Sequence, residues 1–324
     1  MSVQTTEGLR RGYGLPADEA AYLPDPGEPL DRWFQAANAS NADTIVAIAR
    51  DLGVTHVDLV LDPFVGGGSC AVAARLMGLP FYGIELDPVL ACATVAKTRC
   101  TPHHAAVLRS VPDVTDADGL ARALAAIEAR CAPADVLPLS CLAVVRCLRA
   151  ESGRRLPVAD VVRDLRRPDT VPPRLEGRVV CGDATSKESW NAVGDLRGRH
   201  ALVYTSPPFG VVSPRVSVSE PLDAAARGVL RRAGLALDPG LPATFAAYRD
   251  IAMGMLAQAA EALGRASVIV EHEPADDGSD ARLGLAEDVR ARFGDRVRDL
   301  RILESQPFSW RGPLSFVVFE LDAA

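Results

Sequence analysis

Residues 57–88 read VDLVLDPFVGGGSCAVAARLMGLPFYGIELDP, and this stretch decides the fold. Two apolar runs, 57–61 and 81–85, are separated by a glycine-rich turn and by a run of small residues with helical character, 70–77. Two buried strands joined through a helix form a βαβ unit with parallel strands. The sequence therefore predicts an α/β domain built on a mostly parallel sheet.

The glycines after the first predicted strand indicate a ligand site. Gly66, Gly67 and Gly68 let the backbone turn sharply and approach a ligand where a Cβ would collide. Glu85 stands seventeen residues after Gly68, at the end of the second strand, where a carboxylate accepts both hydroxyls of a ribose. The unit therefore predicts a site for a nucleoside-containing cofactor. By itself, the spacing Gly66-x-Gly68-x-x-Ala71 also fits a dinucleotide.

Composition describes an ordinary globular chain. Its 324 residues are 48% hydrophobic and 24% charged, which is enough for a sizeable core. The net charge is −7, so a nucleic-acid partner would need a local basic surface. Seven cysteines without a CxxC pair predict a reducing, cytoplasmic setting. Because no apolar run approaches the ~18 residues that span a bilayer, we expect no membrane partner.

The chain on either side of this unit differs in character. Residues 1–30 are rich in Pro, Gly and Asp without periodicity, which predicts an N-terminal arm before one domain at 31–324. Residues 89–176 carry helical patterns broken by prolines. A crossover between parallel strands needs only about a dozen residues, so most of this stretch is a predicted helical insertion.

Arginine is concentrated at the end of the predicted insertion. Residues 146–178 hold nine arginines against five acidic residues, a local charge of +4. One interpretation is a surface that faces phosphates, because arginine binds phosphate in a bidentate manner. The other, which we favour, is a solvated helix face with internal ion pairs. His103 and His104 do not predict a metal site, because adjacent side chains on a helix diverge.

Five later stretches complete the predicted sheet, which then has seven strands. They are residues 178–181, 201–205, 266–270, 297–303 and 314–321, with the last two as an antiparallel hairpin. The strand 178–181 leads into Asp183, which places a carboxylate at the edge where open α/β sheets bind ligands. The alternative for Asp183, compatible with ligand binding, is a cap for a helix at 185–193.

A second informative stretch is residues 201–210, ALVYTSPPFG. A strand that runs into Pro207 and Pro208 must stop, and the two prolines present backbone carbonyls without competing N–H donors. Such a segment holds hydrogen-bond acceptors at a fixed place. The stretch therefore predicts a rigid group of acceptors at the end of a strand.

Together, the two stretches resemble the motifs of class I S-adenosylmethionine-dependent amino-methyltransferases. The first is similar to the DPFxGxG-S/T cofactor motif of this family, and the second to its T-S-P-P-Y/F motif, most like the cytosine-N4 branch. Tyr204 departs from the aliphatic residue common before the second motif. The matching residues are Asp62-Pro63-Phe64-x-Gly66-x-Gly68-Ser69 and Thr205-Ser206-Pro207-Pro208-Phe209.

The resemblance implies a fold, a cofactor and a site. The fold is a Rossmann-like, seven-stranded, mostly parallel sheet with an antiparallel closing strand, and the cofactor is S-adenosyl-L-methionine. A segment before the first strand closes over the methionine end in this family, which makes Trp33, Phe34, Asn38 and Asn41 candidates, unless the segment is a helix that covers the sheet. The implied cofactor-binding residues are Asp62, Phe64, Gly66, Gly68, Ser69, Glu85, Asp183 and Thr205.

The implied catalytic residues are Ser206, Pro207, Pro208 and Phe209. Ser206 Oγ and the Pro207 carbonyl would accept the two N–H groups of a target amine, and Phe209 would stack on the target ring. The resemblance implies methyl transfer to cytosine N4 or adenine N6 in DNA. The alternatives are the same chemistry on RNA or on an amide or amine of a peptide or small molecule, and a binding module without catalysis.

Overall fold

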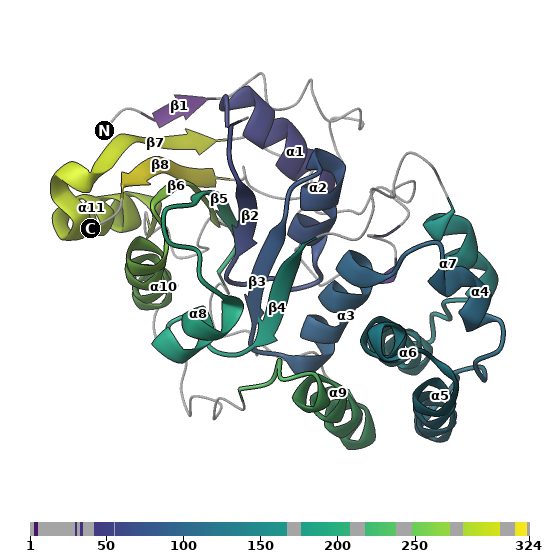
Figure 1. Ribbon diagram of the computed structural model, residues 1–324. Helices are drawn as coiled ribbons and strands as arrows, with labels where there is room; N and C mark the ends of the chain where they lie inside the picture. The colour runs from purple at the N-terminus through teal and green to yellow at the C-terminus, as the bar shows by residue number, and fades with distance from the viewer. Residues whose placement is uncertain are drawn as a thin grey trace.

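A computed structural model describes residues 3–5, 30, 33–34, 42–54, 56–166, 176–207, 218–237, 248–272, 281–304 and 315–322. Within these residues, eight strands form one sheet in the order β1-β7-β8-β6-β5-β2-β3-β4 (Figure 1). The strands are β1 (Val3–Thr5), β2 (Leu59–Asp62), β3 (Phe81–Glu85), β4 (Gly177–Cys181), β5 (His200–Thr205), β6 (Arg265–His272), β7 (Val297–Glu304) and β8 (Ser315–Asp322).

The sheet confirms the predicted fold class. β8 runs antiparallel to both of its neighbours, β6 and β7, and all other pairs are parallel. The seven predicted strands are all present, and the protein is a Rossmann-like α/β fold with an antiparallel closing strand. The prediction missed β1, which pairs with β7 inside the stretch expected to be an arm. Three residues are too short to show the alternation that marks a strand.

The strand order reverses direction at β2. From β2 the chain moves outward to β3 and β4, and then returns to place β5 on the other side of β2. Leu61 lies beside Val203 in this central pair. Open α/β sheets bind ligands at the carboxyl ends of strands where the order reverses. The fold therefore directs attention to the ends of β2 and β5, where the two sequence motifs begin.

Helices cover both faces of the sheet (Figure 1). The neighbours α1 (Ala42–Asp51), α2 (Ser69–Met77) and α3 (Pro88–Arg99) lie on one face. The neighbours α8 (Lys187–Val193), α10 (Tyr248–Ala262) and α11 (Ala281–Phe293), followed by the 3-10 turn η3 (Gly294–Arg296), lie on the other. None of the described helices is both long and apolar enough to cross a membrane.

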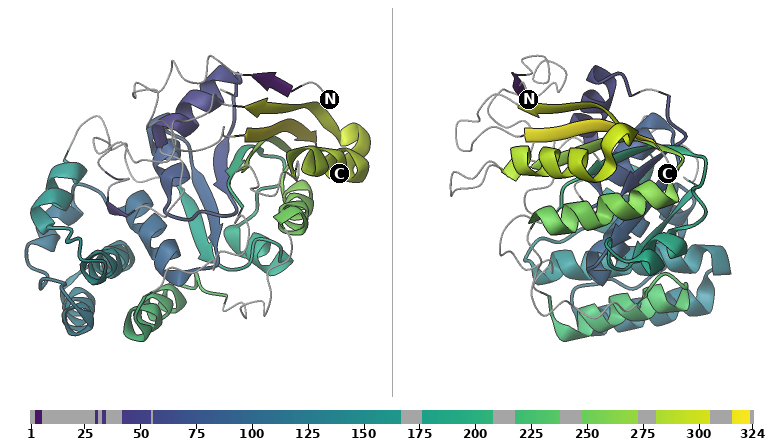
Figure 2. Two further views of the ribbon diagram at one scale, coloured as in Figure 1. Left: turned by 180° about the vertical axis from the view of Figure 1, so that it is seen from behind. Right: turned by 90° about the vertical axis from the view of Figure 1, so that its left-hand side faces the viewer.

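The stretch predicted as an insertion is helical and lies beyond α3, away from β7 and β8 (Figure 2). It consists of α4 (His104–Leu108), α5 (Ala117–Arg130), α6 (Pro133–Glu151) and α7 (Val158–Leu165). α6 and α9 (Glu220–Arg232) pack on each other and on α3. Because α3 is enclosed by the sheet and these helices, all its residues from Pro88 to Thr98 are buried. The division into arm, domain and insertion stays a prediction.

Two arginines of the predicted basic stretch have acidic partners inside the protein. Arg163 bonds to Asp160 at 2.8 Å, and Arg146 is buried in an ion pair with Asp113. The exposed Arg163–Asp160 pair favours the interpretation of a solvated helix face with internal ion pairs, whereas the buried Arg146 fits neither interpretation.

Trp33 connects the segment before α1 to the insertion. Its side chain is fully buried, and its Nε1 donates to Asp164 Oδ2 in α7 at 3.0 Å. The Phe34 carbonyl accepts a bond from Lys97 Nζ at 2.7 Å. Trp33 therefore packs against the insertion, a role that neither sequence interpretation predicted. Asn38 and Asn41 lie outside the described residues.

Candidate functional site

The two sequence motifs meet at the end of β2. Thr205 Oγ1 donates a hydrogen bond of 3.0 Å to Asp62 Oδ1, although the residues are 143 positions apart. Ser206 and Pro207 follow Thr205 directly, and we call these two residues the acceptor lip. Ser206 is partly exposed and Pro207 is buried. The acceptor lip and the glycine turn therefore lie on the same edge of the sheet. Pro208 and Phe209 lie outside the described residues.

The glycine turn is fixed both by its backbone and by α3. Gly66 and Gly68 have φ angles of 52° and 86°. Residues other than glycine rarely adopt positive φ angles of this size. A Cβ on Gly68 would lie 2.7 Å from Thr94 Oγ1 of α3. Gly68 is therefore required by helix packing as well as by the turn, which the sequence alone did not reveal.

Replacement of Gly68 by alanine tests this double constraint. We expect Gly68→Ala to lower the free energy of unfolding by about 2–4 kcal/mol, because left-handed strain and overpacking each cost about 1–3 kcal/mol. Gly53→Ala is the matched control, because Gly53 has a φ of 70° and open space around its Cβ position. Urea denaturation checks both variants. Equal losses would show that the contact with Thr94 is unimportant.

Ser69 is the first residue of α2, and its hydroxyl has no hydrogen-bond partner among the described residues. Its Oγ is buried and makes no hydrogen bond within the described structure. The N-cap residue, Gly68, provides no side-chain cap for the helix. A buried unpaired hydroxyl costs about 1–3 kcal/mol, and an uncapped helix N-terminus attracts negative charge. A ligand carrying a carboxylate would accept a hydrogen bond from the Ser69 hydroxyl and would place negative charge at the N-terminus of α2.

Glu85 ties the glycine turn to the start of α3. It is 7% exposed, and its Oε2 accepts from the Gly66 N–H at 2.7 Å. Its Oε1 accepts from the Asp87 N–H at 2.8 Å. A carboxylate has about four acceptor sites, so each oxygen can still accept a hydroxyl from a ligand. Burial raises the pKa of Glu85 to about 8, against the lowering effect of these hydrogen bonds.

Asp62 is a second buried carboxylate with a perturbed pKa. Burial raises the pKa of Asp62 to about 7, while hydrogen bonds from the Phe64 N–H and Thr205 Oγ1 lower it. The Glu271 carboxylate raises it further by repulsion. Near neutral pH, Asp62 is therefore partly protonated. A bound cation would favour the ionised form, so the site is suited to a positively charged ligand.

Asp183 comes two residues after the end of β4, the strand that pairs with β3 and its last residue, Glu85. Glu85 is paired with Cys181, and the Gly182 N–H donates to the Glu85 carbonyl at 2.9 Å. Asp183 Oδ1 accepts from the N–H and the hydroxyl of Thr185, each at 2.8 Å. The cap of α8 is Ser186, so the alternative that Asp183 caps this helix is wrong. Asp183 Oδ2 makes no hydrogen bond with the described residues and can accept one from a ligand.

One known protein matches this chain over a short stretch. The chain is 22% identical over 69 residues to the Type II methyltransferase M.BsoBI of Geobacillus stearothermophilus. The match spans 21% of this chain and 14% of the length of that protein. No family model matches the chain. The fold and this similarity together fit a methyltransferase.

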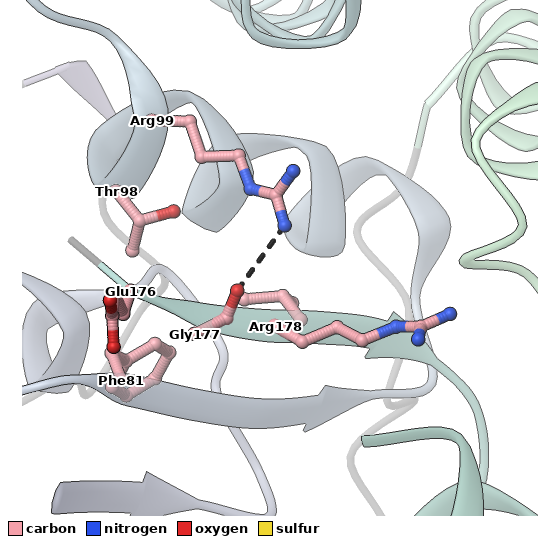
Figure 3. Close-up of a pocket in the computed structure, with 7 residues that line it drawn as sticks. Phe81, Thr98, Arg99, Glu176, Gly177 and Arg178 are labelled. Carbon is pink, nitrogen blue, oxygen red and sulfur yellow. Dashed lines mark hydrogen bonds between the residues drawn. The ribbon is translucent and has the colours of Figure 1, made fainter. Parts of the chain in front are cut away.

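A pocket where β3 and β4 begin lies at the other end of these strands from the candidate site. Figure 3 shows Arg99 reaching from α3 to the Gly177 carbonyl, with which its Nη2 forms a bond of 3.3 Å. A Cβ on Gly177 would lie 1.7 Å from the Phe81 carbonyl oxygen, so this glycine permits β3 and β4 to pair. The pocket is therefore part of a structural joint. Its lining residues are Phe81, Thr98, Arg99, Glu176, Gly177, Arg178 and Val179.

One pair of residues at the site was missed by sequence reasoning. The Tyr204 hydroxyl donates to Glu271 Oε2 at 2.8 Å, and both side chains are buried. The sequence marked Tyr204 only as a departure from the family motif. No local pattern joined Tyr204 to Glu271, because strands β5 and β6 are separated by 59 residues.

Proposed function

We propose that this chain is an S-adenosyl-L-methionine-dependent N-methyltransferase that acts on an exocyclic amine in DNA, at cytosine N4 or adenine N6. The observation that carries the proposal is the Thr205–Asp62 hydrogen bond at the end of β2 and β5. It brings the glycine turn and the acceptor lip to the point where the strand order reverses. The similarity to a Type II methyltransferase supports the same chemistry.

The residues at the turn fit the chemical groups of this cofactor. The unpaired Ser69 hydroxyl and the N-terminus of α2 would hold the carboxylate, and Asp62 would face the ammonium group. Glu85 would accept the ribose hydroxyls, and Asp183 Oδ2 the adenine amino group. Phe64, Gly66, Gly68 and Thr205 complete the proposed binding surface. When bound, the cofactor supplies an electrophilic methyl group on a sulfonium.

The acceptor lip accounts for activation of the target. An amine on an aromatic ring is a poor nucleophile, because its lone pair is delocalised into the ring. Ser206 Oγ and the Pro207 carbonyl accept the two N–H groups, so the nitrogen becomes more tetrahedral and its lone pair points out of the ring plane. Alignment of this kind is worth about 7–11 kcal/mol of a reaction barrier. Pro208 stiffens the lip, and Phe209 stacks on the target base.

The proposed substrate places demands on the protein. A base in duplex DNA must be flipped out to reach the acceptor lip. The net charge of −7 opposes nucleic acid at long range, so binding depends on local basic residues. Arg154 and Arg155 are exposed after α6 and are candidates for phosphate contacts. The affinity for DNA should then fall steeply with salt concentration.

Transfer of a tritiated methyl group tests the proposed function. The protein is incubated with labelled S-adenosyl-L-methionine and, in separate reactions, unmethylated plasmid DNA, total RNA, a peptide mixture and a small-molecule extract. We expect label in DNA, with N4-methylcytosine or N6-methyladenine in the digested product. Label in RNA, peptide or small molecules would replace the DNA proposal with the matching alternative. Cofactor binding without any transfer would indicate a binding module.

A Glu85 variant tests the cofactor site independently of the substrate. At pH 9, above the raised pKa of about 8, Glu85 is ionised, and we expect Glu85→Ala to weaken binding of S-adenosylhomocysteine by about 1.5–3 kcal/mol, the range for hydrogen bonds to a charged group. Glu176→Ala, an exposed glutamate near the other edge of the sheet, is the control. Isothermal titration calorimetry measures both affinities. Unchanged affinity in Glu85→Ala would remove Glu85 from the site.

A further inference from the structure

Two polar side chains are set into the apolar core of β5 and β6, next to the acceptor lip. Tyr204 is 2% exposed and Glu271 is fully buried. Their neighbours along the two strands, Leu202, Val203 and residues 268–270, are apolar and buried. The hydrogen bond of 2.8 Å between the Tyr204 hydroxyl and Glu271 Oε2 links the two strands through their side chains.

The pair lies directly beside both motifs. Tyr204 is two residues before Ser206, and Thr205 is paired with Val270, so the register places Glu271 next to Ser206. On the other side, Leu61 is paired with Val203, which places Asp62 next to Tyr204. Repulsion from the Glu271 carboxylate contributes to the raised pKa of Asp62, so the two acids are close. Tyr204 and Glu271 thus lie beside both the acceptor lip and the glycine turn.

The fold itself does not require this pair. Burial of a carboxylate costs several kcal/mol, and replacement of buried ionic or polar pairs by apolar residues is often neutral or stabilising. Valine or phenylalanine at both positions would continue the apolar pattern of the strands. A satisfied hydrogen bond between buried polar groups does, however, restrict the geometry of the segments that carry them. Here those segments are the last residues of β5 and β6.

We propose that Tyr204 and Glu271 are positioning residues for methyl transfer. Their hydrogen bond fixes the end of β5, so that Ser206 Oγ and the Pro207 carbonyl stay aimed at the target amine. This inference rests on the proposed function and adds two residues to its site. Neither residue exchanges atoms with the substrate; both act through the acceptor lip.

Three variants separate the hydrogen bond from the charge. Tyr204→Phe removes only the hydroxyl. Glu271→Gln removes the charge but keeps an oxygen that accepts from Tyr204. Tyr82→Phe in β3 is the control, because it removes a hydroxyl for which the described structure shows no hydrogen bond. Each variant is assayed for kcat with tritiated S-adenosyl-L-methionine and plasmid DNA, for S-adenosylhomocysteine affinity by calorimetry, and for amide hydrogen exchange at residues 203–206.

We expect kcat of Tyr204→Phe to fall about 10- to 100-fold, since displacement of a reacting group by about 1 Å can cost 10²-fold. Its cofactor affinity should stay near that of the wild type, and its amides at residues 203–206 should exchange faster. Glu271→Gln should keep most of kcat, because its amide oxygen still accepts from the Tyr204 hydroxyl, and adding it to Tyr204→Phe should cause little further loss, because the hydrogen bond is already absent there.

Two results would overturn the inference. One is a kcat of Tyr204→Phe equal to that of Tyr82→Phe, and the other is loss of cofactor affinity in proportion to activity. If the wild-type protein transfers methyl groups to no substrate pool, the proposed function is wrong whatever the role of Tyr204 and Glu271. Hydrogen exchange then tests whether this pair fixes the acceptor lip. Unchanged exchange at residues 203–206 in Tyr204→Phe would show that the pair does not fix the acceptor lip.

Discussion

The double variant Ser206→Ala/Phe209→Ala is expected to abolish methyl transfer and to leave cofactor binding near normal. Ser206 Oγ is the side-chain acceptor of the lip, and the stacking contact of Phe209 is worth about 1–3 kcal/mol for a base. Loss of one precisely placed hydrogen-bonding group in an active site costs about 10²–10³ in kcat. Together the two changes remove alignment of the amine and binding of its ring.

Calorimetry with S-adenosylhomocysteine and single-turnover methyl transfer measure the two properties of this variant. Ser213→Ala is a suitable control, since it changes the same residue type a few positions later in the chain. Loss of cofactor affinity in the double variant would contradict the assignment of Ser206 and Phe209 to the substrate side. Transfer at the wild-type rate would remove the acceptor lip from the mechanism.

Asp62→Asn is expected to weaken cofactor binding and, at the same time, to stabilise the cofactor-free protein at pH 8. Asp62 Oδ1 accepts both hydrogen bonds that the described structure shows for this side chain, from the Phe64 N–H and Thr205 Oγ1, and an asparagine oxygen can accept the same two. The variant therefore removes the charge while keeping the local geometry. Without the charge, affinity for a cationic ligand should fall by about 1.5–3 kcal/mol.

The effect on stability depends on pH with a definite sign. The pKa of Asp62 is raised by burial from 3.8 to about 7, so the folded state binds this proton more tightly than the unfolded state. The resulting stability is fully present below pH 3.8 and is lost as the pH rises through about 7. Above pH 7 the wild-type protein must hold a buried charge. The melting temperature of Asp62→Asn should therefore exceed that of the wild type at pH 8 and approach it at pH 4.

Thermal denaturation across this pH range, with Asp295→Asn as an exposed control, tests the argument. A difference in melting temperature that does not depend on pH would show that Asp62 is not buried as an ionised group. For cofactor binding, affinity in the wild type should increase from pH 5 to pH 8 as Asp62 ionises, and this increase should be smaller in Asp62→Asn.

The main architecture could be predicted because the determining signals are local. Gly66 to Ser69, followed by small residues, indicates a turn into a closely packed helix, and the prolines after Ser206 indicate the end of a strand. Parallel strands bring their carboxyl ends to one edge, so the meeting of the two motifs followed from their place at strand ends. Asp183 was placed at this edge by the same argument.

The contacts that could not be predicted join residues far apart in the chain. Trp33 and Asp164 are 131 positions apart, and Tyr204 and Glu271 are 67. Periodicity reports which face of an element is buried, but not which partner a buried polar group meets. The two backbone bonds of Glu85 also escaped prediction, because they depend on the path of the turn. Sequence therefore located the edge of the sheet that holds the site but not the hydrogen bonds that shape it.

The enclosure of α3 has a consequence for shortening this protein. A shorter protein obtained by excising the segment after α3 and before β4 would expose to water a helix whose residues from Pro88 to Thr98 are all buried. The side of α3 that packs on α6 would lose its cover, and the Cys100 thiol would lose its contact with the Pro138 carbonyl. Such a truncated chain should aggregate on expression rather than form a smaller folded protein. The helices α4 to α7 are thus needed for the rest of the protein to stay folded.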